Sequence, residues 1–408
     1  MTPHQHSVRD MMMPYDLEEG KSMKIKGKSI WVALAVTISF LLVFSCAKEK
    51  EPYKVGAVFS VTGRASFLGD PEKKTAEMIA EAINNTGGIN GHRLELVLYD
   101  DESDETKCVL AVKRLIKKDN VPVIIGPSLS GNTMAVVKVA NDEQVPLVSC
   151  AASNKIVTPV AERKWVFKVP QSDTHAVEKI YDYLLKNGMT KIAIMSVSTG
   201  FGASGREELL RLAPEVGIEI LADERYGPKD TDITAQLTRI RGTGAQAIVN
   251  WSVGPTQVLA VKNWKDLGMT SIPFFQSHGF GSHKNIELAA GAAEGVFCPL
   301  GKVNIPLLVP DDDPQKKVIM LYNEAYEQKY KEPISSFGGH AWDSLNLVID
   351  AMRSVGPDSA KIRDYIENRQ NFIGQHGVFN FSPTDHNGLT KEAFVMVVVK
   401  DCTWALAP

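Results

Sequence analysis

The most constraining feature of this chain is a regular alternation between short apolar segments and segments with helical periodicity. Apolar runs of the buried-strand type occur at 55–59, 94–99, 122–125 and 146–149, and helical patterns lie between them at 70–84, 107–118 and 132–141. Strands that alternate with helices of this length predict βαβ units and a parallel sheet.

The same alternation starts again after residues 165–170. Helical patterns at 176–186, 206–213, 233–241 and 257–267 alternate with strand patterns at 191–197, 218–222, 245–250 and 273–276. Further helices at 315–330, 342–354 and 359–368 precede strands at 377–381 and 394–399. With 408 residues, the chain is long enough for two domains of roughly 100–200 residues each. The sequence therefore predicts an α/β fold of two Rossmann-like, doubly wound lobes.

Two such lobes predict a ligand cleft between them. Ligands of open α/β sheets bind beyond the carboxyl ends of the strands, where loop amides and helix N-termini meet. The positive end of a helix favours an anion, so a small carboxylate is the expected guest. A net charge of −3 gives no basic stripe for nucleic acid. The five cysteines form no CxxC pair or His/Cys cluster, so we expect no metal site and no cofactor.

The N-terminal region has the pattern of an export signal. Lys24, Lys26 and Lys28 precede an apolar run at 30–44, which is shorter than the roughly 20 residues of a spanning helix. Residues 43–46 resemble a bacterial lipobox, so 23–46 is predicted to be a lipoprotein signal peptide, with the lipid on Cys46. The alternative is an N-terminal membrane-anchor helix. Residues 47–52 follow as a short charged tether.

Residues 1–22 do not fit a signal peptide. They place Asp16, Glu18 and Glu19 ahead of the basic region, whereas a signal peptide begins with a positive segment. Met23 is therefore the predicted start of translation, and 1–22 a mis-annotated extension.

Three motifs in order resemble those of the branched-chain amino acid binding-protein family, the type I periplasmic binding proteins. Residues 83–91 (INNTGGING) resemble its "IN-x-x-GG-[IV]-NG", residues 94–101 (LELVLYDD) its "LEL-x-x-YDD", and residues 291–296 (GAAEGV) its "GPAAEG". The resemblance covers the chain from Tyr53 nearly to its C-terminus. It implies two lobes joined by a three-segment hinge, with crossings near Val169, Cys298 and Asn380. The lobes would then comprise 53–169 with 299–380, and 170–298 with 381–408.

The resemblance also implies a binding site in the first lobe. The family binds a ligand carboxylate through a serine after the third strand and a loop after the fourth. Those roles fall on Ser130, on the backbone of Ala151 and on Ser153. A competing interpretation is that these serines only cap the helices that follow them.

In the second lobe the sequence departs from the family pattern. The resemblance assigns ligand contacts to Phe201, where the family has tyrosine, and to Trp251 and Val253. His278 stands where the family has the acid that pairs with a ligand ammonium, and a histidine is not a permanent anion. The predicted ligand is therefore a small carboxylate, preferably an aromatic or aliphatic acid without an α-amino group, with a branched-chain amino acid-like ligand as the other candidate. The alternative is a loop histidine that never meets the ligand.

The predicted function is that of an exported solute-binding protein, monomeric and held at the membrane by its lipid. It would be periplasmic or at the cell surface and would feed an ABC permease in the cytoplasmic membrane. The alternatives are a ligand-sensing domain that presents its closed form to a receptor, and an exported α/β enzyme. Residues 200–205 (GFGASG) match G-x-G-x-x-G, but we interpret them as a tight turn or a close backbone approach. The pairing of Cys108, Cys150, Cys298 and Cys402 stays open.

Overall fold

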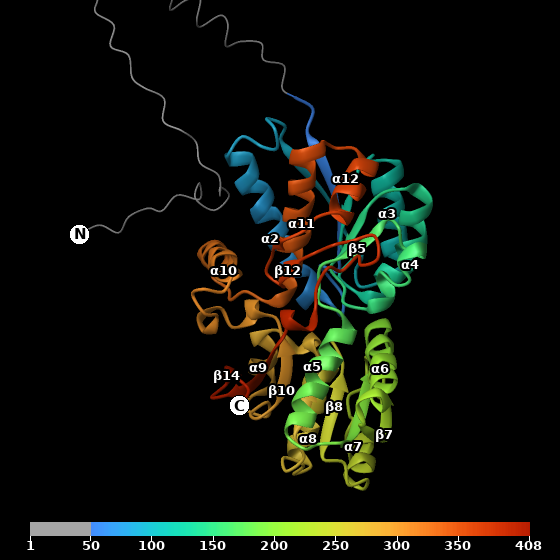
Figure 1. Ribbon diagram of the computed structural model, residues 1–408, viewed down its shortest axis with the longest axis vertical. Helices are drawn as coiled ribbons and strands as arrows, with labels where there is room; N and C mark the ends of the chain where they lie inside the picture. The colour runs from blue at the N-terminus through green and yellow to red at the C-terminus, as the bar shows by residue number, and fades with distance from the viewer. Residues whose placement is uncertain (1–49) are drawn as a thin grey trace, which may run out of the picture.

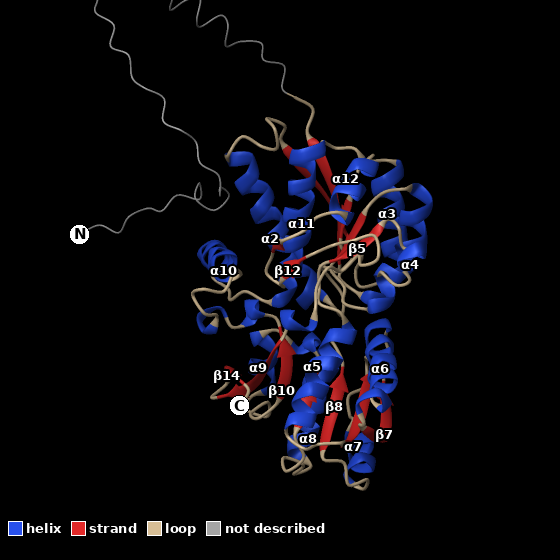
Figure 2. Cartoon of the chain, viewed as in Figure 1, coloured by secondary structure: helices blue, strands red, loops and turns tan. Residues whose placement is uncertain are grey.

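The computed structural model describes residues 50–408, and these form two α/β lobes stacked along the long axis of the molecule (Figure 1). Helices cover the sheets of both lobes (Figure 2). The predicted extension, the signal peptide with Cys46 and the first residues of the tether lie outside the described part of the chain. Within residues 50–408, no helix has both the length and the apolar character needed to cross a membrane.

The first lobe contains a five-stranded sheet in the order β2-β1-β3-β4-β5, in which every pair is parallel. Its strands are β1 (Tyr53–Phe59), β2 (Leu94–Asp100), β3 (Ile124–Ile125), β4 (Leu147–Ser149) and β5 (Val166–Lys168). The connecting helices are α2 (Ser66–Asn85), α3 (Glu105–Lys117) and α4 (Ser130–Glu143). Later segments return to this lobe: α10 (Lys316–Tyr330), α11 (Ser336–Val355), α12 (Ser359–Glu367) and the hairpin β11 (Phe372–Ile373) and β12 (Val378–Phe379).

The second lobe contains a seven-stranded sheet in the order β14-β13-β10-β9-β8-β6-β7. The strands are β6 (Lys191–Val197), β7 (Glu219–Tyr226), β8 (Ala247–Trp251), β9 (Phe274–Gln276), β10 (Phe297–Leu300), β13 (Val395–Lys400) and β14 (Thr403–Leu406). β13 pairs antiparallel with β10, and β14 pairs antiparallel with β13, so these two strands extend one edge of an otherwise parallel sheet. The helices are α5 (Asp173–Lys186), α6 (Gly200–Leu212), α7 (Thr234–Arg241), α8 (Pro255–Asp266) and α9 (His283–Ala289). The predicted fold class is confirmed.

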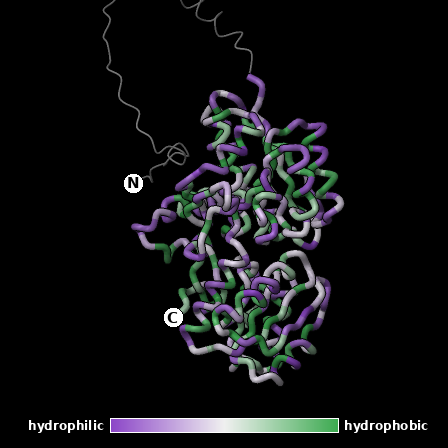
Figure 3. The backbone as a smooth tube through the Cα atoms, turned by 45° about the vertical axis from the view of Figure 1, so that its right-hand side comes forward, coloured by the Kyte–Doolittle hydropathy of each residue, from purple (hydrophilic) through white to green (hydrophobic). Residues whose placement is uncertain are grey.

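Each lobe has its own apolar interior, visible as hydrophobic stretches running through its middle (Figure 3). The central strands are apolar on both faces because helices cover both, as the continuous buried run of β8 illustrates. Side-chain caps mark the starts of two of the helices. Asp104 caps α3 by accepting from the Lys107 amide at 2.9 Å, and Asp358 caps α12 in the same way at Lys361.

The chain leaves the first sheet after β5 and the second after β10, and it enters the second sheet again at β13. Phe381 and Leu389 pack in the core of the first lobe, and Phe381 lies edge-on to Phe167 with ring centroids 6.1 Å apart. Phe394 packs in the second lobe. The predicted boundary at Asn380 therefore lies too early, because the chain crosses between Leu389 and Phe394.

Several helices begin earlier than their sequence patterns predict, and α2, α6 and α11 do so by four residues or more. The pattern at 70–84 predicted a start at Asp70, but α2 begins at Ser66, and Gly69 lets its first turns approach the turn after β1, since a Cβ there would lie 2.2 Å from the Ser60 carbonyl. The glycines at 338 and 339 interrupt the helical pattern of α11, which nevertheless begins at Ser336. A Cβ on Gly338 would lie 2.2 Å from the Tyr322 hydroxyl, so this glycine allows the close packing of α11.

Candidate ligand-binding site

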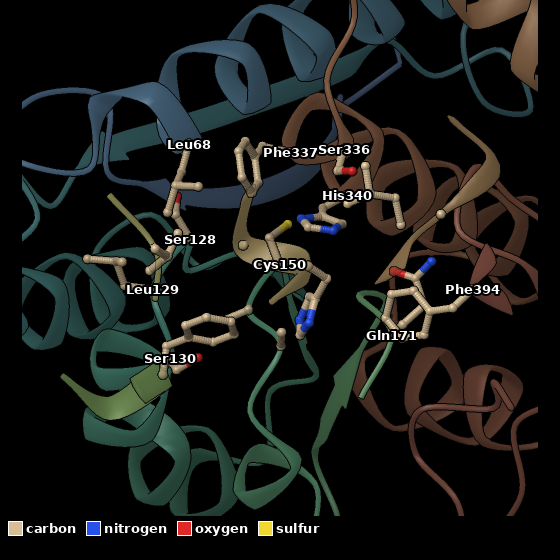
Figure 4. Close-up of a pocket in the computed structure, with 18 residues that line it drawn as sticks. Leu68, Ser128, Leu129, Ser130, Cys150, Gln171, Ser336, Phe337, His340 and Phe394 are labelled. Atoms are coloured by element: carbon tan, nitrogen blue, oxygen red, sulfur yellow. The ribbon is translucent and has the colours of Figure 1, made fainter. Parts of the chain in front are cut away.

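A cavity lies where the two lobes meet, and residues from both of them line it. The cavity has a volume of about 40 Å³ for the centres of water-sized spheres, and about 520 Å³ of empty space when the open solvent at its mouth is included. Figure 4 shows Leu68, Ser128 and Leu129 on one side and Gln171 and Phe394 on the opposite side, with Cys150 and His340 between them. The position agrees with the cleft expected at the carboxyl ends of the strands.

The walls are mostly apolar and carry no permanently charged side chain among the described residues that line the cavity. The apolar lining comes from Leu68, Leu129, Cys150, Ala151, Ala152, Phe201, Val253, Leu300, Phe337 and Phe394. The polar lining comes from Ser128, Ser130, Gln171, Ser336, His278 and His340. A guest here meets hydrogen-bonding groups and apolar surface, without a lysine, arginine or acid in direct contact.

The first-lobe wall is built around the N-terminus of α4. Ser130 is the first residue of this 14-residue helix, and the preceding residue, Leu129, has no side-chain acceptor for the first-turn amides. The helix therefore presents its positive end and unsatisfied amides near the cavity. Ser130 Oγ accepts weakly from the Ser153 amide at 3.4 Å.

The other two residues predicted in this lobe are arranged differently. Ala151 lines the cavity, but its amide already donates to Ser149 Oγ at 3.1 Å. Ser153 is not part of the lining. Its hydroxyl donates at 2.8 Å to Ser204 Oγ on α6, which links the two lobes, and it also accepts from the Lys155 amide. The helix-capping interpretation therefore describes what Ser153 does in this structure.

In the second lobe, Phe201, Val253 and His278 line the cavity, whereas Trp251 does not. Trp251 is fully buried behind them, with its ring centroid 5.9 Å from that of Phe201 and 5.6 Å from that of His278. Its indole thus supports two lining residues from beneath. The apolar, aromatic character of this wall suits a hydrophobic guest.

His278 is the most unusual lining residue. Its side chain is only 9% exposed, and neither ring nitrogen has a hydrogen-bond partner in the described part of the chain. Burial, with the nearby charges of Lys168 and His376, lowers the pKa of His278 to about 3. The imidazole is therefore neutral in the ligand-free protein near pH 7.

A second imidazole, His340, faces the same cavity from α11. Its Nδ1 has no hydrogen-bond partner within residues 50–408, and burial lowers its pKa well below the ordinary value. Its ring packs on that of His376, with centroids 4.2 Å apart. No group of three or more His, Cys, Asp or Glu suited to a metal ion occurs in the described residues.

Sequence reasoning missed the contribution of α11 and of the crossovers. Ser336, Phe337 and His340 come from the first turns of α11, and Gln171, Leu300 and Phe394 come from the three crossovers. Gln171, Leu300 and Phe394 could have been predicted from the three crossings that the resemblance implies, because segments that pass between lobes border the cleft. The first group had no such signal, since the glycines at 338 and 339 obscured the start of the helix.

The G-x-G-x-x-G match lies inside α6 and is explained by packing. A Cβ on Gly202 would lie 1.8 Å from the Val197 carbonyl oxygen, and one on Gly205 would lie 2.0 Å from the Trp251 indole. Both glycines let the helix approach β6 and β8 closely. The cysteines form no disulfide in the described residues: Cys108, Cys150 and Cys298 are buried thiols, and Cys402 is exposed.

Comparison with known proteins decides the family. A profile of the periplasmic binding protein family matches residues 52–403, which is most of the chain. The chain belongs to this family. The predicted resemblance to branched-chain amino acid binding proteins is thereby confirmed, and a solute-binding role and export from the cytoplasm follow from membership.

Individual relatives agree with this assignment. The leucine-, isoleucine-, valine-, threonine- and alanine-binding protein of Pseudomonas aeruginosa is 24% identical over 313 residues, covering 76% of this chain and 81% of its own. An extracellular ligand-binding receptor from Rhodopseudomonas palustris HaA2 superimposes with a TM-score of 0.82 and 28% identity, covering 88% of this chain and all of its own. A branched-chain amino acid transporter substrate-binding protein from Streptococcus pneumoniae, solved with isoleucine, gives a TM-score of 0.75 at 24% identity, covering 87% and 98% of the two chains. These relatives are binding proteins and not enzymes.

Proposed function

We propose that this periplasmic binding protein captures a small carboxylic acid without an α-amino group and delivers it to an ABC permease. The observation that carries the proposal is the neutral His278 in a cavity whose lining has no acidic side chain. An α-ammonium group buried in such a cavity would lack an anionic partner, and burying an unpaired charge is strongly unfavourable.

The acid end of the ligand has candidate donors in both lobes. The first turn of α4 with Ser130 offers amides, a hydroxyl and the positive end of a helix. His278 offers a ring N–H from the second lobe. Phe201, Phe337 and Phe394 provide apolar surface for the rest of the molecule.

Contacts from both lobes couple binding to closure. A ligand that bridges Ser130 and His278 stabilises the closed arrangement relative to the open one, by the difference in its affinity for the two. The Ser153–Ser204 hydrogen bond, 2.8 Å long, would add to the same closed form. A permease could then distinguish loaded from empty protein by the relative position of the lobes.

The remaining sequence-based assignments complete the proposal. Cleavage before Cys46 and lipid attachment there would hold the protein on the outer side of the cytoplasmic membrane or at the cell surface. Residues 47–52 would act as the tether, and the protein would work as a monomer. The lobes would comprise 53–169 with 299 to about 390, and 170–298 with the remaining C-terminal residues.

A second candidate ligand is a branched-chain amino acid, favoured by the ligands for which the relatives above are named. Leucine and 4-methylpentanoate discriminate the two, because they share the side chain and the carboxylate and differ only in the ammonium group. A ligand at about 100 times its Kd stabilises a protein by roughly 2.7 kcal/mol. We expect a thermal-shift assay to show stabilisation by 4-methylpentanoate or benzoate and none by leucine. Stabilisation by leucine alone would refute the amine-free assignment.

A further inference from the structure

A buried acid without a hydrogen-bond partner lies directly behind the cavity. Asp173 is the first residue of α5 and is fully buried, and neither carboxylate oxygen has a hydrogen-bond partner in the described part of the chain. A buried carboxylate in this state is costly, so its presence calls for a physical explanation. Its position at the first turn of a 14-residue helix offsets only part of that cost.

His278 lies close to Asp173, whose carboxylate also has Ser204, Asn154 and Lys168 in its surroundings. Asp173 Oδ1 lies 3.9 Å from His278 Nε2, just beyond hydrogen-bond distance. His278 lines the cavity and Asp173 does not, so the imidazole stands between the acid and any guest. The other ring nitrogen, Nδ1, is also without a partner among the described residues and is left to interact with a ligand.

The second charged neighbour, Lys168, makes its hydrogen bonds to backbone carbonyls and not to Asp173. This fully buried lysine at the end of β5 donates to the Ala152 carbonyl at 3.1 Å and to the Pro170 carbonyl at 3.0 Å. Burial lowers its pKa and raises that of Asp173. Taken together, the lysine and the acid contribute no net charge toward an entering anion.

The remaining titratable groups near His278 supply no unpaired positive charge either. His340 from α11 and His376 from the segment after β11 are the other titratable side chains near it, and His376 Nδ1 lies 2.8 Å from the carboxylate of Asp343. Phe201, Trp251 and Phe394 surround the ring with uncharged aromatic surface. An acid entering the cavity therefore finds no permanent positive charge.

We propose that Asp173 is a positioning residue that lets His278 become a cation when an acid binds. On entry of the ligand carboxylate, His278 takes one proton from solvent. The imidazolium then donates through Nδ1 to the ligand and through Nε2 to Asp173. One N–H bond forms at His278, one O–H bond of a hydronium ion breaks and leaves water, and the added proton balances the charge of the ligand. The inference rests on the proposed function.

The same arrangement explains selectivity against amino acids. An imidazolium at this place repels a ligand ammonium, whereas it attracts a carboxylate of the same shape. Because binding takes up a proton, affinity for an acid should fall as the pH rises, by up to about tenfold per pH unit between the pKa of His278 in the free protein and its higher pKa in the complex, and should level off above the latter.

The test follows the protonation of His278 in the presence of 4-methylpentanoate. Nitrogen and carbon NMR shifts of labelled histidine distinguish imidazolium from imidazole in the purified protein at pH 7, and His278→Gln assigns the signal. We expect His278 to be neutral without the acid and charged with it. Calorimetric titration in two buffers of different ionisation enthalpy should show proton uptake on binding.

Asp173→Asn is the diagnostic variant, and Asp182→Asn is its matched control. Asp182 lies on the same helix but is exposed and pairs with Lys391 at 2.8 Å. We expect Asp173→Asn to leave His278 neutral in the complex and to weaken binding of 4-methylpentanoate by about tenfold, the equivalent of one pKa unit. Asp182→Asn should behave as the wild type.

Two results would overturn the inference, and they are distinguishable from failure of the proposed function. If 4-methylpentanoate binds the wild type and His278 stays neutral, the inference is wrong while the proposed function stands. The same holds if Asp173→Asn folds and keeps a charged His278. If neither 4-methylpentanoate nor benzoate binds the wild type, the proposed function and the inference both fall.

Discussion

Gly205 offers a sharp test of how the second-lobe wall is supported. It lies inside α6, and a methyl group in place of its hydrogen would come within 2.0 Å of the Trp251 indole. Trp251 is fully buried and packs next to Phe201 and His278. In Gly205→Ala, either the helix or the indole must therefore move.

The magnitude follows from two opposing effects. Overpacking a close-packed core costs about 1–3 kcal/mol, and a contact this short belongs at the upper end. Alanine is favoured over glycine inside a helix by about 1 kcal/mol. The net loss should be about 2 kcal/mol. A shift of Phe201 and His278 should also weaken binding of 4-methylpentanoate about tenfold, or roughly 1.4 kcal/mol.

Urea unfolding followed by tryptophan fluorescence measures the first effect, and calorimetric titration measures the second. Gly242→Ala is the matched control, because the nearest atom to its added methyl is the Arg239 carbonyl oxygen at 3.5 Å. That substitution should change stability by less than about 0.5 kcal/mol. Equal stability and equal affinity of the two variants would refute the account of Trp251 as a support.

Three further predictions concern the cavity and its surroundings. His278→Glu places a permanent anion in the cavity, so leucine should now stabilise the protein and 4-methylpentanoate should not; an unchanged order of ligands in the thermal-shift assay would contradict this. Because the pKa of His278 is about 3 in the folded protein and about 6.5 in an unfolded chain, the unfolded state binds more protons between these values and stability is lost as the pH falls from 6.5 toward 3. In urea unfolding between pH 4 and 6, His278→Gln should reduce this dependence by about 1.4 kcal/mol per pH unit, and an unaltered slope would count against a neutral buried His278. Ser153→Ala removes the 2.8 Å hydrogen bond to Ser204 between the lobes, so Kd should rise about two- to tenfold, whereas an equal Kd would mean that this bond does not favour closure.

The sequence predicted the layered fold because the relevant signals are local. The apolar run of β1 predicts a strand, and the capping residue and periodicity of α3 predict a helix, each from only a few residues. The cavity was predicted in outline for the same reason, since the carboxyl ends of β3 and β4 are followed by Ser130 and Ala151. The structure brings both to the cavity, together with His278 from the other lobe.

The sequence did not show how far each residue lies from the cavity surface, or which way its side chain points. Trp251 and Ser153 lie at the expected positions along the chain, yet one stands behind the wall and the other points to Ser204. Local patterns cannot distinguish a lining residue from one a layer behind it. The burial of Asp173 and Lys168 depends on crossovers far apart in the chain: Asn387 donates to the Lys168 carbonyl at 3.2 Å. No window around either charge indicates that it is inaccessible to water.

The central claim is that a carboxylic acid binds between the lobes and contacts both of them. A crystal structure of the protein grown with 4-methylpentanoate tests this most directly. The account predicts the carboxylate in the cavity, within hydrogen-bond distance of the first turn of α4 at Ser130 and of the imidazole of His278. An acid bound outside the cavity, or touching residues of only one lobe, would contradict it.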